Sequence, residues 1–259
     1  HKDIADSRWF TGSGIYRKVT LIVKDKICID NYGVFISTKH ANNEEAELDV
    51  QTSIINTTHE DADVVLKSYI YDDQNKLLAS LESKHHISSE GSFTDKDSMI
   101  VKQPRLWSPD SPYLYTFITE IEKDGSIIDR EETKIGIRVF EFDPDKGFFL
   151  NGKNMKMKGV CVHHDAGCLG AALRKKVWER RLEKLKEMGC NAIRMSHNPH
   201  MPELYDLCDA MGFLVIDEAF DEWEGVKNKW AQGHNVYPPA HYGYYEDFPE
   251  WHERDLATM

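Results

Sequence analysis

The sequence lacks long apolar runs and an excess of basic residues. No stretch approaches the roughly 18 consecutive apolar residues of a membrane-spanning helix, so we expect no membrane partner. The 32 Lys and Arg residues stand against 44 Asp and Glu, which gives a net charge of −12. Nucleic acids and anionic membranes are bound by basic faces, so we expect no nucleic acid partner either. The charge fits a soluble protein that acts on neutral ligands.

Several catalytic motifs are also absent. No Gly-x-Gly-x-x-Gly or phosphate loop follows an apolar run, so a nucleotide site has no support. The patterns His-Glu-x-x-His, Gly-x-Ser-x-Gly and Cys-x-x-Cys are missing as well. The five cysteines are odd in number and lie outside paired spacings. We therefore expect reduced, mostly buried thiols and no zinc site.

The first half of the chain shows the period-two pattern of short strands. Apolar residues alternate over residues 19–23, 48–54 and 64–70, and polar turn clusters such as Asp72-Asp73-Gln74-Asn75 separate the runs. Alternation with regular turns is typical of an immunoglobulin-like β-sandwich. The Cys…Trp…Cys spacing of antibody domains is absent. We assign the sandwich to residues 18–140.

The pattern then changes to strands that alternate with helices. Asn151-Gly152 marks a hairpin turn. Apolar runs at 160–162, 192–195 and 213–216 alternate with two stretches of helical period that each end in a glycine. This β-α-β-α-β order fits the start of a (β/α)8 TIM barrel or half of a doubly wound sheet. We favour the barrel, over residues 141–259, because all three strand ends are polar. Eight units need about 250 residues, so we expect the barrel to be truncated.

Polar side chains follow each of the three apolar runs. Carboxyl ends of adjacent parallel strands lie about 4.8 Å apart, so the three ends should form one polar patch about 10 Å across. Histidines, an amide and carboxylates can hydrogen-bond a polyhydroxylated ligand, and an arginine can hold a carboxylate bidentately. Trp and Tyr residues of the loop after the third run could stack on sugar faces. The patch comprises His163, His164, Asp165, Arg194, Ser196, His197, Asn198, Asp217 and Glu218.

Each of these residues also has a plain structural explanation. A single histidine at a strand end is more often a satisfied structural group, and Asp217-Glu218 could merely cap and pair. Neighbouring residues on a strand point in opposite directions. Asp217 and Glu218 are therefore a poor acid and nucleophile pair for retaining glycoside hydrolysis, which needs carboxyl groups about 5–5.5 Å apart. Polar residues at three successive strand ends nevertheless favour a binding site.

Seven segments, in order along the chain, resemble glycoside hydrolase family 2, and within it the bacterial β-galactosidases. β-Glucuronidases and β-mannosidases share this framework, but His-His-Asp and Asp-Glu-Ala-Phe-Asp-Glu-Trp are more similar to β-galactosidases. The segments are SRWFTGSGIYR (7–17), LWSPDSPYLY (106–115), GFFLNGKNMKMKGV (147–160), HHD (163–165), NAIRMSHNP (191–199), ELYDLCDAM (203–211) and LVIDEAFDEW (214–223).

The resemblance implies which functional residues the chain carries. Residues 1–17 would be the end of an N-terminal jelly-roll sugar-binding domain, where a sugar-contacting Asp of some members falls near Arg8. His163 and His197 would contact the sugar, with Arg194 in support; the substrate-binding set also includes Asn198, Asp165, Asp217 and Glu218.

The family's acid/base is a Glu in an Asn-Glu pair after the fourth barrel strand, and its nucleophile is a Glu after the seventh. The only Asn-Glu here is Asn43-Glu44, in the sandwich. We therefore expect neither catalytic Glu in this chain, which would start and end inside a longer protein. Glu222 matches a magnesium-binding position of some members, but Glu224 stands where they have His. We expect no required cofactor, with Glu222 as the one candidate ligand for Mg in the parent.

The sequence thus predicts a fragment of a retaining exo-β-glycosidase that hydrolyses terminal β-galactosides. A β-glucuronidase or β-mannosidase of the same family is the nearest alternative. A non-catalytic carbohydrate-binding or scaffold segment is the alternative from another class. We expect a β-galactoside or related carbohydrate as ligand and a homo-oligomeric parent. The compartment stays open between bacterial cytoplasm and periplasm.

Overall fold

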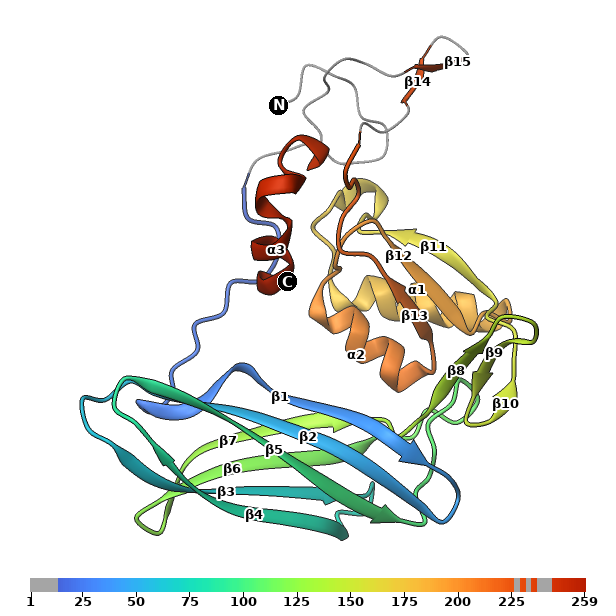
Figure 1. The fold of residues 1–259 in the computed structure, drawn as a ribbon. Coiled ribbons are helices and arrows are strands. Elements are labelled where there is room, and N and C mark those ends of the chain that lie inside the picture. Colours follow the sequence, from blue (N-terminus) through green and yellow to red (C-terminus); the bar gives the residue numbers. More distant parts are fainter. Residues whose placement is uncertain (1–13, 226–228, 232–233, 237–243) are drawn as a thin grey trace. The chain divides into compact units, whose positions relative to one another are not determined.

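The computed structural model describes residues 14–225, 229–231, 234–236 and 244–259. The chain divides into two compact units (Figure 1). The sandwich unit comprises Thr20–Lys156 and Asp209–Gly212, and the barrel unit comprises His1–Val19, Met157–Cys208 and Phe213–Met259. The expected domain boundaries after residues 17 and 140 stay predictions. The side-chain placements expected for Arg8, Trp230, Tyr237 and Tyr242 lie outside the described residues.

Two antiparallel sheets form the sandwich, as the alternating pattern predicts. One sheet has the order β1-β2-β5 and the other has the order β4-β3-β6-β7. In β2, every second residue from Ala46 to Asn56 is buried, and Val64, Leu66, Ser68 and Ile70 are buried in β3. The strands are β1 (Ile27–Ala41), β2 (Glu45–Asn56), β3 (Ala62–Tyr71), β4 (Leu77–Ile87), β5 (Gly91–Lys102), β6 (Tyr115–Lys123) and β7 (Ser126–Ile135).

The core of the sandwich lies between the inner faces of these sheets. Leu48 and Met99 of one sheet and Ile70 and Phe117 of the other belong to a single cluster, and each is at most 1% exposed. Apolar side chains that alternate with polar ones can all turn to one face of a strand. The β-sandwich prediction is therefore confirmed.

The strand expected over residues 19–23 is wrong. Val19, Leu21 and Val23 are 79%, 88% and 84% exposed, and the first strand of the described residues begins at Ile27. Among the described residues, no strand pairs with this segment. Alternation alone cannot form a strand, because its backbone groups need a partner strand.

A small three-stranded sheet follows β7. It has the order β10-β9-β8, with β8 at Phe140–Asp143, β9 at Gly147–Leu150 and β10 at Lys153–Asn154. The predicted Asn151-Gly152 turn joins β9 to β10, and both residues have positive φ, of 50° and 73°. A two-residue turn of this type requires positive φ at both positions, which explains Asn-Gly.

The barrel unit contains the predicted β-α-β-α-β order. Its strands β11 (Gly159–His163), β12 (Ala192–Ser196) and β13 (Leu214–Asp217) are parallel and adjacent in the order β11-β12-β13. The helices between them are α1 (Lys175–Glu187) and α2 (Pro202–Met211). The described residues thus show an immunoglobulin-like sandwich and three parallel strands in the order expected for the start of a TIM barrel, without barrel closure.

The helices bury the faces that their sequences indicate. Leu182 in α1 is fully buried together with Trp178, and Leu204, Leu207 and Cys208 are buried in α2. Met188, which directly follows α1, is 74% exposed. The described helices are too short and too polar to cross a bilayer. The remaining elements are η1 (Gly167–Leu169), β14 (Lys229–Ala231), β15 (His234–Val236), η2 (Tyr244–Glu246) and α3 (Phe248–Thr258).

Candidate functional site

The parallel register brings the three polar strand ends to one edge of the sheet. His163 at the end of β11 lies opposite Ser196 of β12, and Met195 of β12 lies opposite Asp217 of β13. His197 follows β12, and its ring centroid lies 5.2 Å from that of His163, with the rings at 79°. Two imidazoles from adjacent strands therefore share one edge, as the sequence predicts.

A carboxylate from the third strand end joins this pair to an arginine. Glu218 Oε1 accepts a hydrogen bond of 2.7 Å from Arg194 Nε and a further one from Arg194 Nη2. Glu218 Oε2 lies 3.0 Å from His197 Nδ1. The three side chains are only partly exposed, at 39% for Arg194, 22% for Glu218 and 18% for His197. One carboxylate thus holds both a cation and an imidazole.

Arg194 has a second partner on β11. Its Nη1 lies 3.3 Å from Cys161 Sγ. Hydrogen bonding to Cys161, and then to Glu218, raises the pKa of Arg194 above its usual range. Arg194 therefore stays a fixed positive charge between the first and third strands.

Asp217 turns away from this network. Its Oδ2 accepts a 2.9 Å hydrogen bond from the hydroxyl of Tyr205 in α2, and that hydroxyl accepts one of 3.2 Å from the backbone N–H of His200. Burial and the hydrogen bond to Asp217 raise the pKa of Tyr205. Asp217 and Glu218 therefore serve different partners, as expected for neighbours on a strand.

Asp165 and Asn198 have surroundings that differ from those of Glu218. Asp165 Oδ1 lies 3.7 Å from Arg181 of α1, and its side chain is 39% exposed. Asn198 is half-buried beside His197, and within the described part of the chain its side chain has no hydrogen bond. Their assignment to the substrate-binding set stays a prediction.

The described residues do not supply a complete magnesium site. Glu222 is buried, at 5% exposed, whereas Glu224 is exposed. Across residues 14–225 and the other described segments, no three His, Cys, Asp or Glu side chains gather in metal-binding geometry. Magnesium prefers octahedral oxygen ligands, so the donor set of this part of the chain does not fit a complete site.

His164, predicted to join the polar patch, is instead buried against His200, a residue that the sequence did not single out. His164 and His200 are 9% and 2% exposed, and their ring centroids lie 5.3 Å apart at 89°. Burial, with Arg17 and His200 nearby, lowers the pKa of His164 to about 4. Burial also lowers the pKa of His200. His164 directly follows His163, the last residue of β11, and this adjacency is the signal that would have turned its side chain away from that of His163.

Arg17 is a second residue that the sequence did not single out as functional. Its Nη2 donates a 2.8 Å hydrogen bond to the carbonyl of Pro199, and its Nη1 lies 3.5 Å from the carbonyl of His200. Lys18 forms an ion pair with Glu203 at the start of α2. Arg17 therefore holds the backbone just beyond His197 and Asn198.

Tyr244, in the loop after β13, packs within the protein. Tyr244 stacks on Phe220 with ring centroids 5.0 Å apart at 15°, and its hydroxyl donates to Asp255. Trp223, in contrast, is 69% exposed. Among the described aromatic side chains of this loop, that of Trp223 is therefore exposed enough to stack on a sugar. Tyr244 instead contributes to packing.

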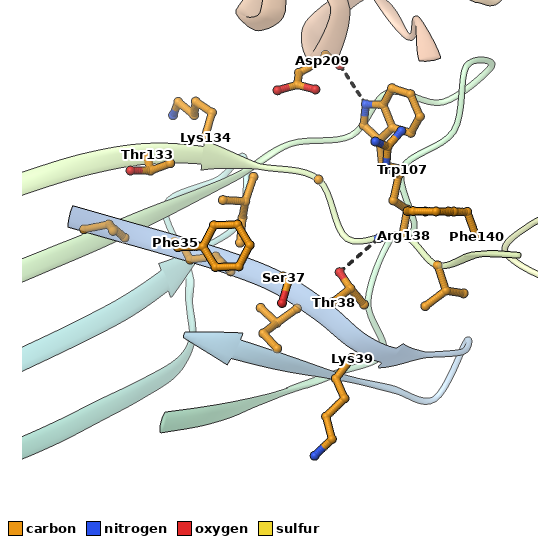
Figure 2. A pocket seen from close by; sticks show the side chains of 16 residues that line it. Phe35, Ser37, Thr38, Lys39, Trp107, Thr133, Lys134, Arg138, Phe140 and Asp209 are labelled. Atoms are coloured by element: carbon orange, nitrogen blue, oxygen red, sulfur yellow. Dashed lines mark hydrogen bonds between the residues drawn. The ribbon is translucent and has the colours of Figure 1, made fainter. Parts of the chain in front are cut away.

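A hollow of about 660 Å³ in the sandwich unit has none of the predicted site residues in its lining (Figure 2). In it Arg138 lies 4.7 Å from the centre of the Trp107 ring, and the Trp107 indole N–H donates to the carbonyl of Asp209. Lys39 bonds Glu47, and Lys134 bonds Thr116, so neither ammonium is directed at a ligand. The hollow brings together no carboxylate pair or nucleophile with a base.

Comparison with known proteins identifies both units. The sequence model "Glycosyl hydrolases family 2" matches residues 29–138, and the model "Glycosyl hydrolases family 2, TIM barrel domain" matches residues 143–259. The chain is 43% identical over 251 residues to a β-galactosidase of Bacteroides ovatus, covering 97% of this chain and 28% of that protein. It is 32% identical over 212 residues to a β-glucuronidase of Bacteroides fragilis, covering 79% and 30%.

Solved structures agree with this assignment. The crystal structure of a glycosyl hydrolase family 2 member from Bacteroides cellulosilyticus matches with a TM-score of 0.85 at 38% identity, over 97% of this chain and 31% of that one. A β-glycosidase from Bacteroides vulgatus matches with a TM-score of 0.81 at 36% identity, over 96% and 30%. This chain therefore spans about a third or less of the length of these relatives.

Proposed function

Since the chain belongs to the glycosyl hydrolases of family 2, we propose that it is part of a retaining exo-β-galactosidase and forms one wall of its sugar-binding subsite. The observation that carries the proposal is the meeting of His163, His197 and the Arg194–Glu218 pair at one sheet edge. In TIM-barrel enzymes the active site lies at the carboxyl ends of the strands. Imidazoles there can hold sugar hydroxyls in place, which lowers the entropic part of the barrier.

The same geometry argues that the bond-breaking carboxyl groups come from elsewhere in the parent. Retaining hydrolysis needs an acid/base and a nucleophile about 5–5.5 Å apart. Glu218 is held by Arg194 and His197, and Asp217 by Tyr205. The only Asn-Glu pair, Asn43-Glu44, lies in the turn between β1 and β2 of the sandwich. We therefore propose that the chain contributes to sugar binding but supplies neither catalytic Glu.

Two related activities compete with β-galactosidase. The identity of 43% to a β-galactosidase, against 34% to a putative β-glucuronidase over a similar length, favours the galactoside. Arg194 pairs with Glu218 and Arg181 lies near Asp165, so these two arginines each face a carboxylate of the chain rather than a uronic acid. Two further alternatives are β-mannosidase activity and a non-catalytic carbohydrate-binding or scaffold role. The substrate that the full-length protein turns over distinguishes both from β-galactosidase.

A panel of aryl glycosides assayed on the full-length protein tests the proposal. We expect the largest kcat/KM on an aryl β-galactoside and much smaller values on the matching β-glucuronide and β-mannoside. A preference for one of those sugars would reassign the specificity within the family. Absence of turnover on every sugar of the panel would support the scaffold role.

A further inference from the structure

We propose that Glu218 is a positioning residue that acts through His197. It fixes the His197 ring in the tautomer that carries its proton on Nδ1, so that Nε2 is the atom that accepts a hydrogen bond from a sugar hydroxyl. This inference rests on the proposed function, and it removes Glu218 from the residues expected to touch the sugar.

The argument begins with the two oxygens of Glu218. Oε1 accepts hydrogen bonds from two nitrogens of Arg194, and Oε2 lies 3.0 Å from His197 Nδ1. A carboxylate paired with a guanidinium accepts hydrogen bonds and donates none. The proton in the 3.0 Å contact therefore belongs to Nδ1 of His197. A carboxylate behind an imidazole is a common way to select its tautomer and orientation.

The tautomer decides what His197 can recognise. In a neutral imidazole with Nδ1 protonated, Nε2 is a hydrogen-bond acceptor. An acceptor binds a hydroxyl that donates, and it does not bind fluorine, which has no proton to give. The ring of His163, 5.2 Å away, lies edge to face with that of His197 and limits its rotation. His197 should therefore hold one hydroxyl of the sugar in a donor role.

Arg194 makes the arrangement electrically balanced. Its charge offsets that of Glu218, and its fork of N–H groups fixes the plane of the carboxylate. Arg194 and Glu218 therefore act together to hold the His197 ring in one orientation.

The test is a double-mutant cycle in the full-length protein. Glu218→Gln should lower kcat/KM on an aryl β-galactoside by about 10- to 100-fold, the range of coupling for groups in one network. In a His197→Ala background, the same substitution should cost less than about threefold. Equal losses in both backgrounds would overturn the proposal, because Glu218 would then act independently of His197.

The kcat/KM values on monodeoxyfluoro galactosides test the role of Glu218 more directly. If Glu218 only maintained the fold, its substitution would not change the relative values on these substrates. The wild-type protein should penalise fluorine at one ring position by about tenfold or more, and Glu218→Gln should reduce that penalty to under about threefold. An unchanged pattern of penalties with uniformly lower rates would assign Glu218 to fold maintenance. The control is Glu187→Gln, which breaks the exposed 2.8 Å pair with Lys184 on α1 and should leave every rate unchanged.

A spectroscopic measurement separates this inference from the proposed function. In ¹⁵N-histidine-labelled full-length protein, the signals lost in His197→Ala identify His197. Wild type should show a protonated Nδ1 and a bare Nε2, and Glu218→Gln should shift the ring toward the other tautomer. A bare Nδ1 in the wild type refutes the inference even if the enzyme is active. A protonated Nδ1 without turnover on any sugar would retain it and refute the glycosidase. If Glu218→Gln does not fold, Glu218→Asp, too short to reach both partners, replaces it.

Discussion

Acid should weaken the barrel unit through His164, and the size of the effect follows from its burial. Its pKa is about 4 in the folded chain, mainly because of burial, against 6.5 for an ordinary histidine. The depressed value means that the folded state resists protonation. At pH 7 both states are mostly neutral and the residue costs little. As the pH falls through 6.5, the unfolded state gains a proton that the folded state does not take until the pH nears 4. Linkage then gives a loss of about 2 kcal/mol at pH 5 and about 3 kcal/mol below pH 4.

Urea unfolding of the wild type and of His164→Gln at pH 7 and pH 5 measures this loss. Carboxylates titrate in both proteins, so the difference between their free energies of unfolding isolates His164. We expect that difference to shift by about 2 kcal/mol in favour of the variant at pH 5. His86→Gln is the control of opposite sign, since the hydrogen bond to Asp63 raises the pKa of the exposed His86. A His164 difference that is the same at both pH values would refute the burial argument.

Three further outcomes are expected. The isolated 259-residue chain should show no turnover of aryl β-galactosides, and clear turnover would contradict the proposal that it supplies neither catalytic Glu. In the full-length parent, His197→Ala should lower activity by about 100-fold or more with an unchanged circular dichroism spectrum; near wild-type kinetics would return His197 to a structural role. Trp178→Ala should destabilise the protein by about 3–5 kcal/mol in chemical denaturation, because the side chain is fully buried; a loss under about 1 kcal/mol would mean that the core refills the space.

The sequence predicted the parallel part of the fold well because its strands are short apolar runs with polar ends. In the sandwich, β4 and β5 were harder to predict. β5 carries Asp95, Lys96 and Asp97 and exposes most of its residues, so its pattern gives little sign of a buried face. The prediction for residues 19–23 is wrong for the opposite reason. Their apolar residues alternate as in a strand, but no strand of the described chain pairs with them.

The sequence predicted which residue types the site contains. The hydrogen bonds that connect these residues could be assigned only from the structure. Which carboxylate meets His197 depends on the register of β12 against β13, and a shift of one residue would offer Asp217 in place of Glu218. The bond from Arg17 to the carbonyl of Pro199 spans 182 positions and uses a backbone acceptor, which leaves no side-chain signal in the sequence. Local patterns therefore locate a strand end, and tertiary contacts decide its chemistry.

The bond from Arg17 to Pro199 has a consequence for the order in which the protein matures on the ribosome. Arg17 is synthesised 182 residues before its acceptor, at roughly 5–20 residues per second. Nearly the whole sandwich, with a core of its own, is made in that interval. The arginine has to wait for this acceptor until β12 and the loop after it have emerged, so the backbone just beyond His197 becomes fixed only after most of the sandwich has been made.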